Sequence, residues 1–189
     1  MKYQTGSEVM EGYRHEITEI RKKMRKAQGE IEPQEVSDYT FSTPAGSVRL
    51  SELFGKHTDL MVIHNMGRSC PACTLWADGY NGIHAHVTSR TAFVVTSPDA
   101  PDVQQAFAAS RGWKFPMVSH QGTSFAADMG YAIDKRWRPG ISVFQRRGNA
   151  IVRMSDAHLG PGDDFCTLYH LFDLLPDGSA GWSPKFNYS

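Results

Sequence analysis

The sequence predicts an α/β fold with a mixed central sheet and helices on both faces. Two continuous apolar runs, residues 60–64 and 91–96, have the length and composition of strands that are buried on both faces. Helical patterns follow both runs, which gives the order of a βαβ unit, and two further runs flank the turn Gly148-Asn149 as a hairpin. We expect three parts: an N-terminal helical extension (1–37), the α/β domain (38–176) and a surface tail (177–189).

The extension contains an amphipathic helix over residues 9–28. Its apolar side chains recur at steps of three and four, at Val9, Tyr13, Ile17, Ile20 and Met24. The remaining surface is rich in lysine and arginine. A solvated helix face and a docking or dimerisation arm both explain this pattern, so a homodimer stays open.

The domain's elements follow in order along the chain. A hairpin is expected around the turn at residues 43–46, then a short helix at 51–54 and the strand at 60–64. A helix runs from Pro71 towards His86, and the strand at 91–96 leads to a helix at 102–111 with Val103, Ala106 and Phe107 inward. A short strand at 115–119, a helical turn at 124–130, the hairpin 141–154 and a helix at 165–174 complete the domain.

Composition excludes several classes of function. The chain has 189 residues, and 20 basic side chains balance 20 acidic ones, so nothing draws the whole chain to nucleic acid. No apolar run approaches the roughly 20 residues that span a bilayer, and the first residues lack a secretory signal. We therefore expect a cytoplasmic protein that binds neither nucleic acid nor membrane.

Two of the three cysteines carry the predicted chemistry. Cys70 and Cys73 form a C-x-x-C pair that follows a predicted buried strand and opens a predicted helix. The helix N-terminus favours a thiolate at Cys70, and Pro71 fits the first helical position because its missing N–H is not needed there. Cys73 follows one helical turn later, within reach of a disulfide. These residues predict a nucleophile, Cys70, and a resolving thiol, Cys73.

A structural role and a metal-binding role for the cysteine pair also stay open. Buried cysteines often serve only as small apolar side chains, which is the role we expect for Cys166 of the last helix. A zinc site needs four ligands, and no second C-x-x-C exists, although His64, His84 and His86 are candidates. We expect neither a metal nor a cofactor.

The segment S-C-P-A-C-T-L-W-A-D-G-Y-N-G at 69–82 resembles a bacterial thioredoxin-like family known as domain of unknown function 899, described as predicted dithiol-disulfide oxidoreductases. Residues 46–66, 111–119 and 139–144 resemble the same family and the wider thioredoxin and peroxiredoxin superfamily. The resemblance covers roughly residues 38–176. It implies a thioredoxin-like fold with Cys70 and Cys73 as the redox pair.

The resemblance also implies roles for residues around the dithiol. Pro139 matches the proline that thioredoxin folds hold in the cis form opposite the dithiol, where it would present the carbonyl side of Arg138 to an incoming disulfide, with an ordinary trans turn proline as the alternative. His64 replaces a buried acid, so its imidazole is a candidate acceptor for the Cys73 proton, with a hydrogen-bonded core histidine as the alternative.

Three further side chains belong to the predicted site. Arg68 is a candidate to stabilise the thiolate or guide an anionic substrate, or is a solvated loop side chain. Trp76 and Asp78 match the family pattern on the dithiol helix: Trp76 is expected to pack, and Asp78 to orient His64 or cap a loop.

The sequence thus predicts a dithiol–disulfide oxidoreductase that uses a protein or small-molecule disulfide and a thiol electron donor. The alternatives are a peroxiredoxin-like peroxidase and a non-catalytic, redox-responsive binding protein. Peroxiredoxins carry a threonine three residues before the attacking cysteine, whereas this chain has Gly67 there, which counts against direct peroxide reduction.

Overall fold

The computed structural model describes residues 1–134 and 136–188. Its residues form two compact units, Met1–Pro33 and a larger unit from Gln34 onward. The first unit consists of helix α1 (Tyr3–Gly29), which starts six residues before the predicted helix. No helix in the described part of the chain has both the length and the apolar character that a membrane span requires.

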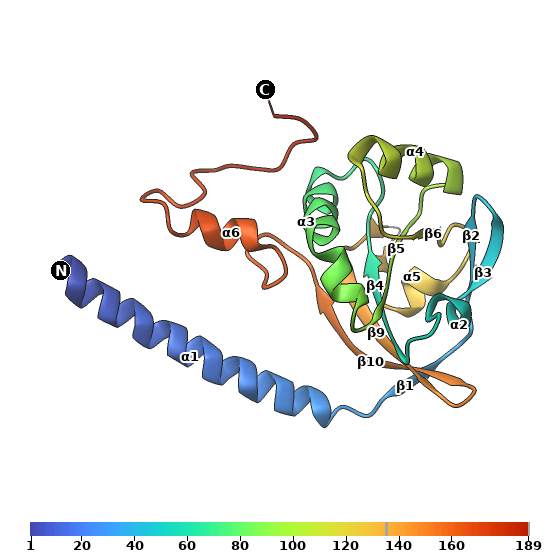
Figure 1. The fold of residues 1–189 in the computed structure, drawn as a ribbon, viewed down its shortest axis with the longest axis horizontal. Coiled ribbons are helices and arrows are strands. Elements are labelled where there is room, and N and C mark those ends of the chain that lie inside the picture. The colour runs from blue at the N-terminus through green and yellow to red at the C-terminus, as the bar shows by residue number, and fades with distance from the viewer. Residues whose placement is uncertain (135, 189) are drawn as a thin grey trace. The chain divides into compact units, whose positions relative to one another are not determined.

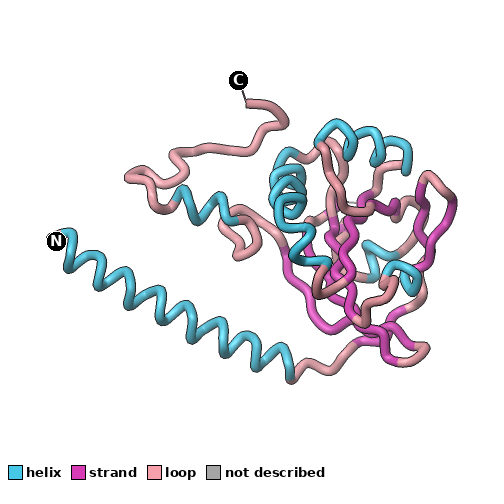
Figure 2. Tube along the Cα trace, viewed as in Figure 1, coloured by secondary structure: helices cyan, strands magenta, loops and turns pink. Residues whose placement is uncertain are grey.

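The larger unit is built on a mixed sheet (Figures 1 and 2). Its strands are β1 (Gln34–Val36), β2 (Thr40–Thr43), β3 (Gly46–Arg49), β4 (Asp59–His64), β5 (Ala92–Ser97), β6 (Met117–Ser119), β9 (Gly140–Arg147) and β10 (Ala150–His158). They are ordered β1-β10-β9-β4-β5-β6-β2-β3. Strands β4, β5 and β6 run parallel, and β9 pairs antiparallel with β4, which confirms the predicted mixed sheet.

Helices pack on both faces of this sheet. They are α2 (Leu50–Leu53), α3 (Pro71–Thr88), α4 (Pro101–Arg111), α5 (Phe125–Asp128) and α6 (Thr167–Phe172). A first core cluster joins α2 and α5 to one face through Leu50 and Phe125. A second core cluster joins α3 to the other face through Trp76 and Tyr80, with α4 and α6 packed against it.

Side-chain alternation along β4 divides its residues between the two clusters. Leu60 and Val62 belong to the first cluster and Ile63 to the second, because successive side chains of a strand point to opposite faces. Residues 60–63 of the strand are therefore all apolar, as the sequence predicted. The face that each residue occupies decides what it can contact at the end of the strand.

The larger unit also differs from the predicted elements. Strand β1 pairs with β10 although its residues show no apolar alternation, and a separate hairpin joins β7 (Ala132–Ile133) to β8 (Arg136–Trp137). In α4, Ala106 is exposed and Gln104 is buried instead. The Gln104 amide replaces apolar contact with hydrogen bonds to Ser97 and to the Val118 carbonyl, which explains how a polar side chain occupies the inward position.

Candidate functional site

The dithiol lies where the chain enters α3. Cys70 is the N-cap residue, with extended backbone, and Pro71 occupies the first turn. The Cys73 backbone N–H donates to the Cys70 Sγ at 3.1 Å, so the sulfur takes the place of the usual capping oxygen. The helix therefore directs an otherwise unpaired N–H group at the Cys70 sulfur, a position that favours a thiolate.

The two thiols are in contrasting electrostatic states. A hydrogen bond from the Cys73 side chain, together with backbone N–H groups of Ala72 and Cys73, lowers the pKa of Cys70 from 9.0 to about 7 against the opposing effect of burial. The same side-chain hydrogen bond, burial and the charge of Cys70 raise the pKa of Cys73 far above its usual range. Near neutral pH, Cys70 is therefore the thiol that ionises, whereas Cys73 keeps its proton.

The two cysteines also differ in their exposure to solvent. Cys73 is only 4% exposed, and its Sγ accepts a 3.4 Å hydrogen bond from the Met66 N–H. Cys70 is partly exposed and is a free thiol. The residue with the lowered pKa is thus also the one that a substrate can reach.

The loop between β4 and α3 is held by two side chains that the sequence analysis did not single out. Asn65 Oδ1 accepts from the Gly67 N–H at 2.8 Å, and Asp99 Oδ2 accepts from the Arg68 N–H at 2.7 Å. Gly67 has a positive φ of 101°, and a Cβ there would lie 3.0 Å from both Asp99 carboxylate oxygens. The loop therefore requires glycine at the position where the resemblance implied threonine in peroxiredoxins.

Arg68 lies on the rim of a groove next to this loop. The groove is lined by Arg68 and by residues of α4, among them Asp102, Phe107 and Ser110. Arg68 itself is exposed. The structure thus places a cation two residues before Cys70, beside a surface that a substrate can reach.

The His64 ring points away from the dithiol helix. It stacks on two side chains of the first core cluster, with ring centroids 3.9 Å from Tyr131 and 5.3 Å from Phe125, and its Nε2 is 2.9 Å from the Ser142 Oγ. Burial, reinforced by the nearby charges of His120 and Arg153, lowers its pKa well below 6.5. No hydrogen bond between described residues joins His64 to Cys73, although both border one small cavity, so the expected proton-transfer contact is not formed.

Pro139 borders the same small cavity as Cys73. The cis form that the resemblance implied is wrong, because the described residues contain no cis peptide bond. The Arg138 N–H donates to the Tyr131 carbonyl, and the Pro139 carbonyl accepts from the Leu159 N–H. These bonds suit the trans chain that enters β9, and trans is the preferred form of X–Pro bonds.

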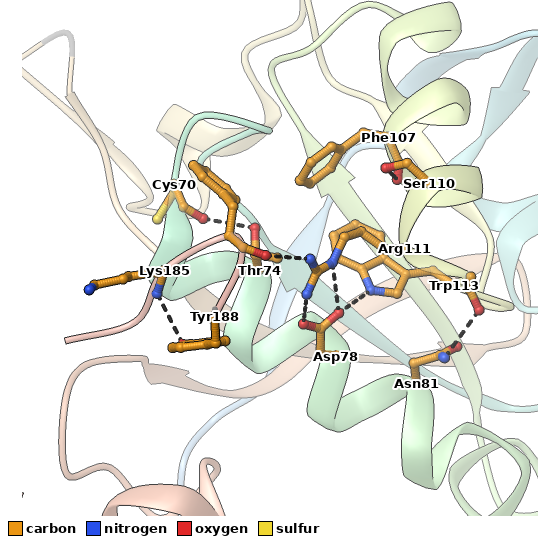
Figure 3. A network of polar contacts seen from close by, with 12 residues as sticks. Cys70, Thr74, Asp78, Asn81, Phe107, Ser110, Arg111, Trp113, Lys185 and Tyr188 are labelled. Atoms are coloured by element: carbon orange, nitrogen blue, oxygen red, sulfur yellow. Dashed lines mark hydrogen bonds and ion pairs between the residues drawn. The ribbon is translucent and has the colours of Figure 1, made fainter. Parts of the chain in front are cut away.

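Trp76 and Asp78 anchor α3 to its neighbours. The buried Trp76 donates from Nε1 to Asp163 Oδ2 at 3.0 Å. Asp78 accepts from Trp113 Nε1 at 2.8 Å and forms an ion pair with Arg111, whose other amino group donates to the Phe186 carbonyl (Figure 3). Asp78 thus neither orients His64 nor caps a loop, and it links the dithiol helix to α4 and, through Arg111, to the C-terminal segment.

The third cysteine and the candidate zinc ligands lie elsewhere. Cys166 is 7% exposed in the second core cluster, and burial raises the pKa of its thiol. The His84 ring packs against Phe93 and Phe115. Within residues 1–134 and 136–188, no three metal-binding side chains come together as a group.

Several solved peroxiredoxins have a similar fold. Reduced Prx3 from Vibrio vulnificus has 15% sequence identity and a TM-score of 0.58, and the match covers 70% of this chain and 89% of that one. Peroxiredoxin Q from Xanthomonas campestris has 18% identity, a TM-score of 0.56 and coverages of 64% and 80%. Peroxidoxin BcpB from Mycobacterium tuberculosis has 19% identity and a TM-score of 0.53, and the match covers 67% of this chain and 84% of that one. These likenesses show the thioredoxin-like fold.

No curated protein matches the sequence. A family model described as "Bacterial protein of unknown function (DUF899)" matches residues 10–186, which includes the dithiol, the Asp78 anchor and most of α1. The chain therefore belongs to this family of bacterial proteins.

Proposed function

We propose that the protein is a thiol–disulfide oxidoreductase in which Cys70 is the nucleophile and Cys73 the resolving thiol. The observation that carries the proposal is the difference between the two sulfurs: Cys70 has a pKa of about 7 and is accessible, whereas Cys73 is buried and protonated. Thiol–disulfide exchange needs this pairing, because the thiolate is the attacking species and a second sulfur must stay within reach.

In the first step, the Cys70 thiolate attacks one sulfur of a substrate disulfide. The substrate S–S bond breaks, a Cys70–substrate disulfide forms, and the departing substrate sulfur leaves as a thiolate that takes a proton from water. The substrate is a protein or small-molecule disulfide. Arg68, on the groove rim, is placed to attract a substrate with a negative charge near its disulfide.

The second step follows from the charge that the first step removes. The hydrogen bond to the Cys70 thiolate and its negative charge both raise the pKa of Cys73. Once Cys70 is part of a mixed disulfide it carries no charge, so both effects disappear and the Cys73 pKa falls. Cys73 then loses its proton to water and attacks Cys70, which releases the second substrate thiolate and leaves a Cys70–Cys73 disulfide. This order needs no proton transfer to His64.

An external dithiol or low-molecular-weight thiol reduces the Cys70–Cys73 disulfide and completes the cycle. A reducing compartment such as the cytoplasm supplies donors of this class. The second candidate function is a thiol peroxidase, because the similar solved structures are peroxiredoxins, one of them in complex with H2O2. In that reaction, the Cys70 thiolate would attack one peroxide oxygen and become a sulfenic acid, while the O–O bond breaks and the second oxygen leaves, after protonation, as water or an alcohol.

Reduction of a protein disulfide in the presence of a thiol donor tests the proposal. We expect the wild type to reduce the disulfide faster than it consumes hydrogen peroxide. Cys70→Ser is expected to lower the rate by at least on the order of 100-fold, because it removes the group that forms the covalent intermediate. Cys166→Ser, which changes the buried cysteine outside the C-x-x-C pair, is the matched control and should retain the rate.

Equal turnover by the wild type and Cys70→Ser would contradict the proposal. Peroxide consumption that outpaces disulfide reduction, and is lost in Cys70→Ser, would favour the peroxidase instead.

A further inference from the structure

Helix α1 presents an apolar stripe that nothing within its own unit covers. The side chains of Met10, Tyr13, Ile17, Ile20 and Met24 are 46–60% exposed, and no residue of the helix is buried. Solvent exposure of a whole row of large apolar side chains is costly, and contiguous patches of this kind mark interaction sites. The stripe therefore needs a partner surface.

The spacing of the stripe identifies the kind of surface. Met10, Tyr13, Ile17, Ile20 and Met24 follow steps of three, four, three and four, a period of 3.5 residues. The same register continues outward to Gly6 and Ala27. Apart from Val9, which flanks it, the stripe keeps to these two positions in each heptad, as the seam of a coiled coil does, whereas a helix that packs on a globular core or a membrane surface carries a wider apolar face.

The charges of α1 favour a second copy of the same helix as the partner. Residues 3–20 contain four glutamates and one arginine, whereas residues 21–29 contain five basic residues and no acidic one. Parallel pairing would place the two basic ends side by side. Antiparallel pairing places each acidic half against a basic half, and the Coulomb energy favours that orientation.

The stripe itself fits an antiparallel pair in one register. With the two-fold axis between residues 18 and 19, Ile17 faces Ile20 of the second copy, Tyr13 faces Met24 and Met10 faces Ala27. Each layer then joins apolar side chains, and the smallest residue meets a long, flexible one. The flanking positions bring Glu16 near Lys23 of the second copy, an attractive pair, and Arg14 near Arg21, a repulsive one, so the preference for this orientation comes from the opposite charges of the two halves of the helix.

We propose that α1 forms an antiparallel two-stranded coiled coil with a second copy of this chain. The paired helices are about 40 Å long at 1.5 Å per residue. The two chains leave the coiled coil at its opposite ends. The pairing uses no residue of the dithiol site of either chain. The proposal does not depend on the proposed function, because it uses no residue of the larger unit.

The test is the oligomeric state of the full-length protein by sedimentation equilibrium. We expect the wild type to be dimeric, and Ile17→Asp/Ile20→Asp to be monomeric because it puts four carboxylates into the central layers. The matched control, His15→Asp/Thr18→Asp, adds the same charge at the same spacing away from the stripe and should stay dimeric. Circular dichroism shows that the larger unit remains folded in each variant.

Crosslinking establishes the orientation. In a Cys70→Ser/Cys73→Ser background, oxidation of a mixture of Tyr13→Cys and Met24→Cys proteins should give the mixed dimer, whereas Tyr13→Cys alone should not crosslink to itself. Crosslinking of Tyr13→Cys to itself would overturn the antiparallel arrangement. A wild-type protein that is monomeric at every concentration, or a dimer that survives Ile17→Asp/Ile20→Asp, would overturn the coiled coil.

Discussion

Cys73→Ser is expected to turn the protein into a trap for its substrate. With Cys70 intact, the first attack still forms the mixed disulfide, but no second sulfur remains to resolve it. The serine hydroxyl can also donate to Cys70 as the thiol does, which keeps the nucleophile activated. We expect turnover to fall by at least on the order of 100-fold while a covalent Cys70–substrate adduct accumulates, seen by mass spectrometry of the unreduced protein.

The double variant Cys70→Ser/Cys73→Ser is the control, and it should form no adduct. Adduct formation that persists in this control would assign the reaction to Cys166. Full turnover by Cys73→Ser would contradict a resolving role for Cys73, and would fit a one-cysteine mechanism instead.

Gly140→Ala is expected to be severely destabilising. Gly140 starts β9 and pairs with His64 of β4, and a Cβ at this position would overlap the ring of Tyr131. That ring cannot swing aside, because Tyr131 is 1% exposed, stacks on His64 and donates its hydroxyl proton towards the Ile141 and Ala157 carbonyls. We expect a loss of at least about 3 kcal/mol in the free energy of unfolding, measured by urea denaturation.

Gly79→Ala makes the same chemical change as Gly140→Ala but is expected to stabilise the protein. Gly79 is exposed in α3, and a Cβ there would meet nothing within 4 Å. Alanine is the better helix former, so we expect the free energy of unfolding to rise by up to about 1 kcal/mol. Equal urea midpoints for the two variants would contradict the packing of Tyr131 against β9.

The parts that the sequence predicted well depend on neighbours along the chain. The apolar runs of β4 and β5, the proline at the start of α3 and the C-x-x-C spacing are local patterns, and each has a direct physical meaning. The position of Cys70 at the helix N-terminus follows from these patterns alone. The short strand β1 lacked such a pattern, because it is a strand only through its pairing with β10.

The parts that the sequence did not predict depend on contacts between distant segments. His64 lies six residues before Cys70, yet alternation along β4 turns its ring to Tyr131 and leaves Ile63 on the side of α3. Asp99 holds the Arg68 backbone from the end of the neighbouring strand β5. Because parallel strands end at one edge of the sheet, an acidic residue just after β5 was the available signal.

Ionisation of Cys70 tests the activated dithiol most directly, and the ultraviolet absorbance of the thiolate measures it as a function of pH. The thiolate signal should reach half its amplitude near pH 7, because Cys73 and the helix N–H groups hold the Cys70 pKa at about 7. Cys73→Ala removes the side-chain hydrogen bond, which is the largest cause of the lowered Cys70 pKa, so the midpoint should rise towards the ordinary 9.0. Cys73→Ser keeps a donor at this position and should change the midpoint less. A wild-type midpoint near 9, unchanged in Cys73→Ala, would contradict an activated dithiol.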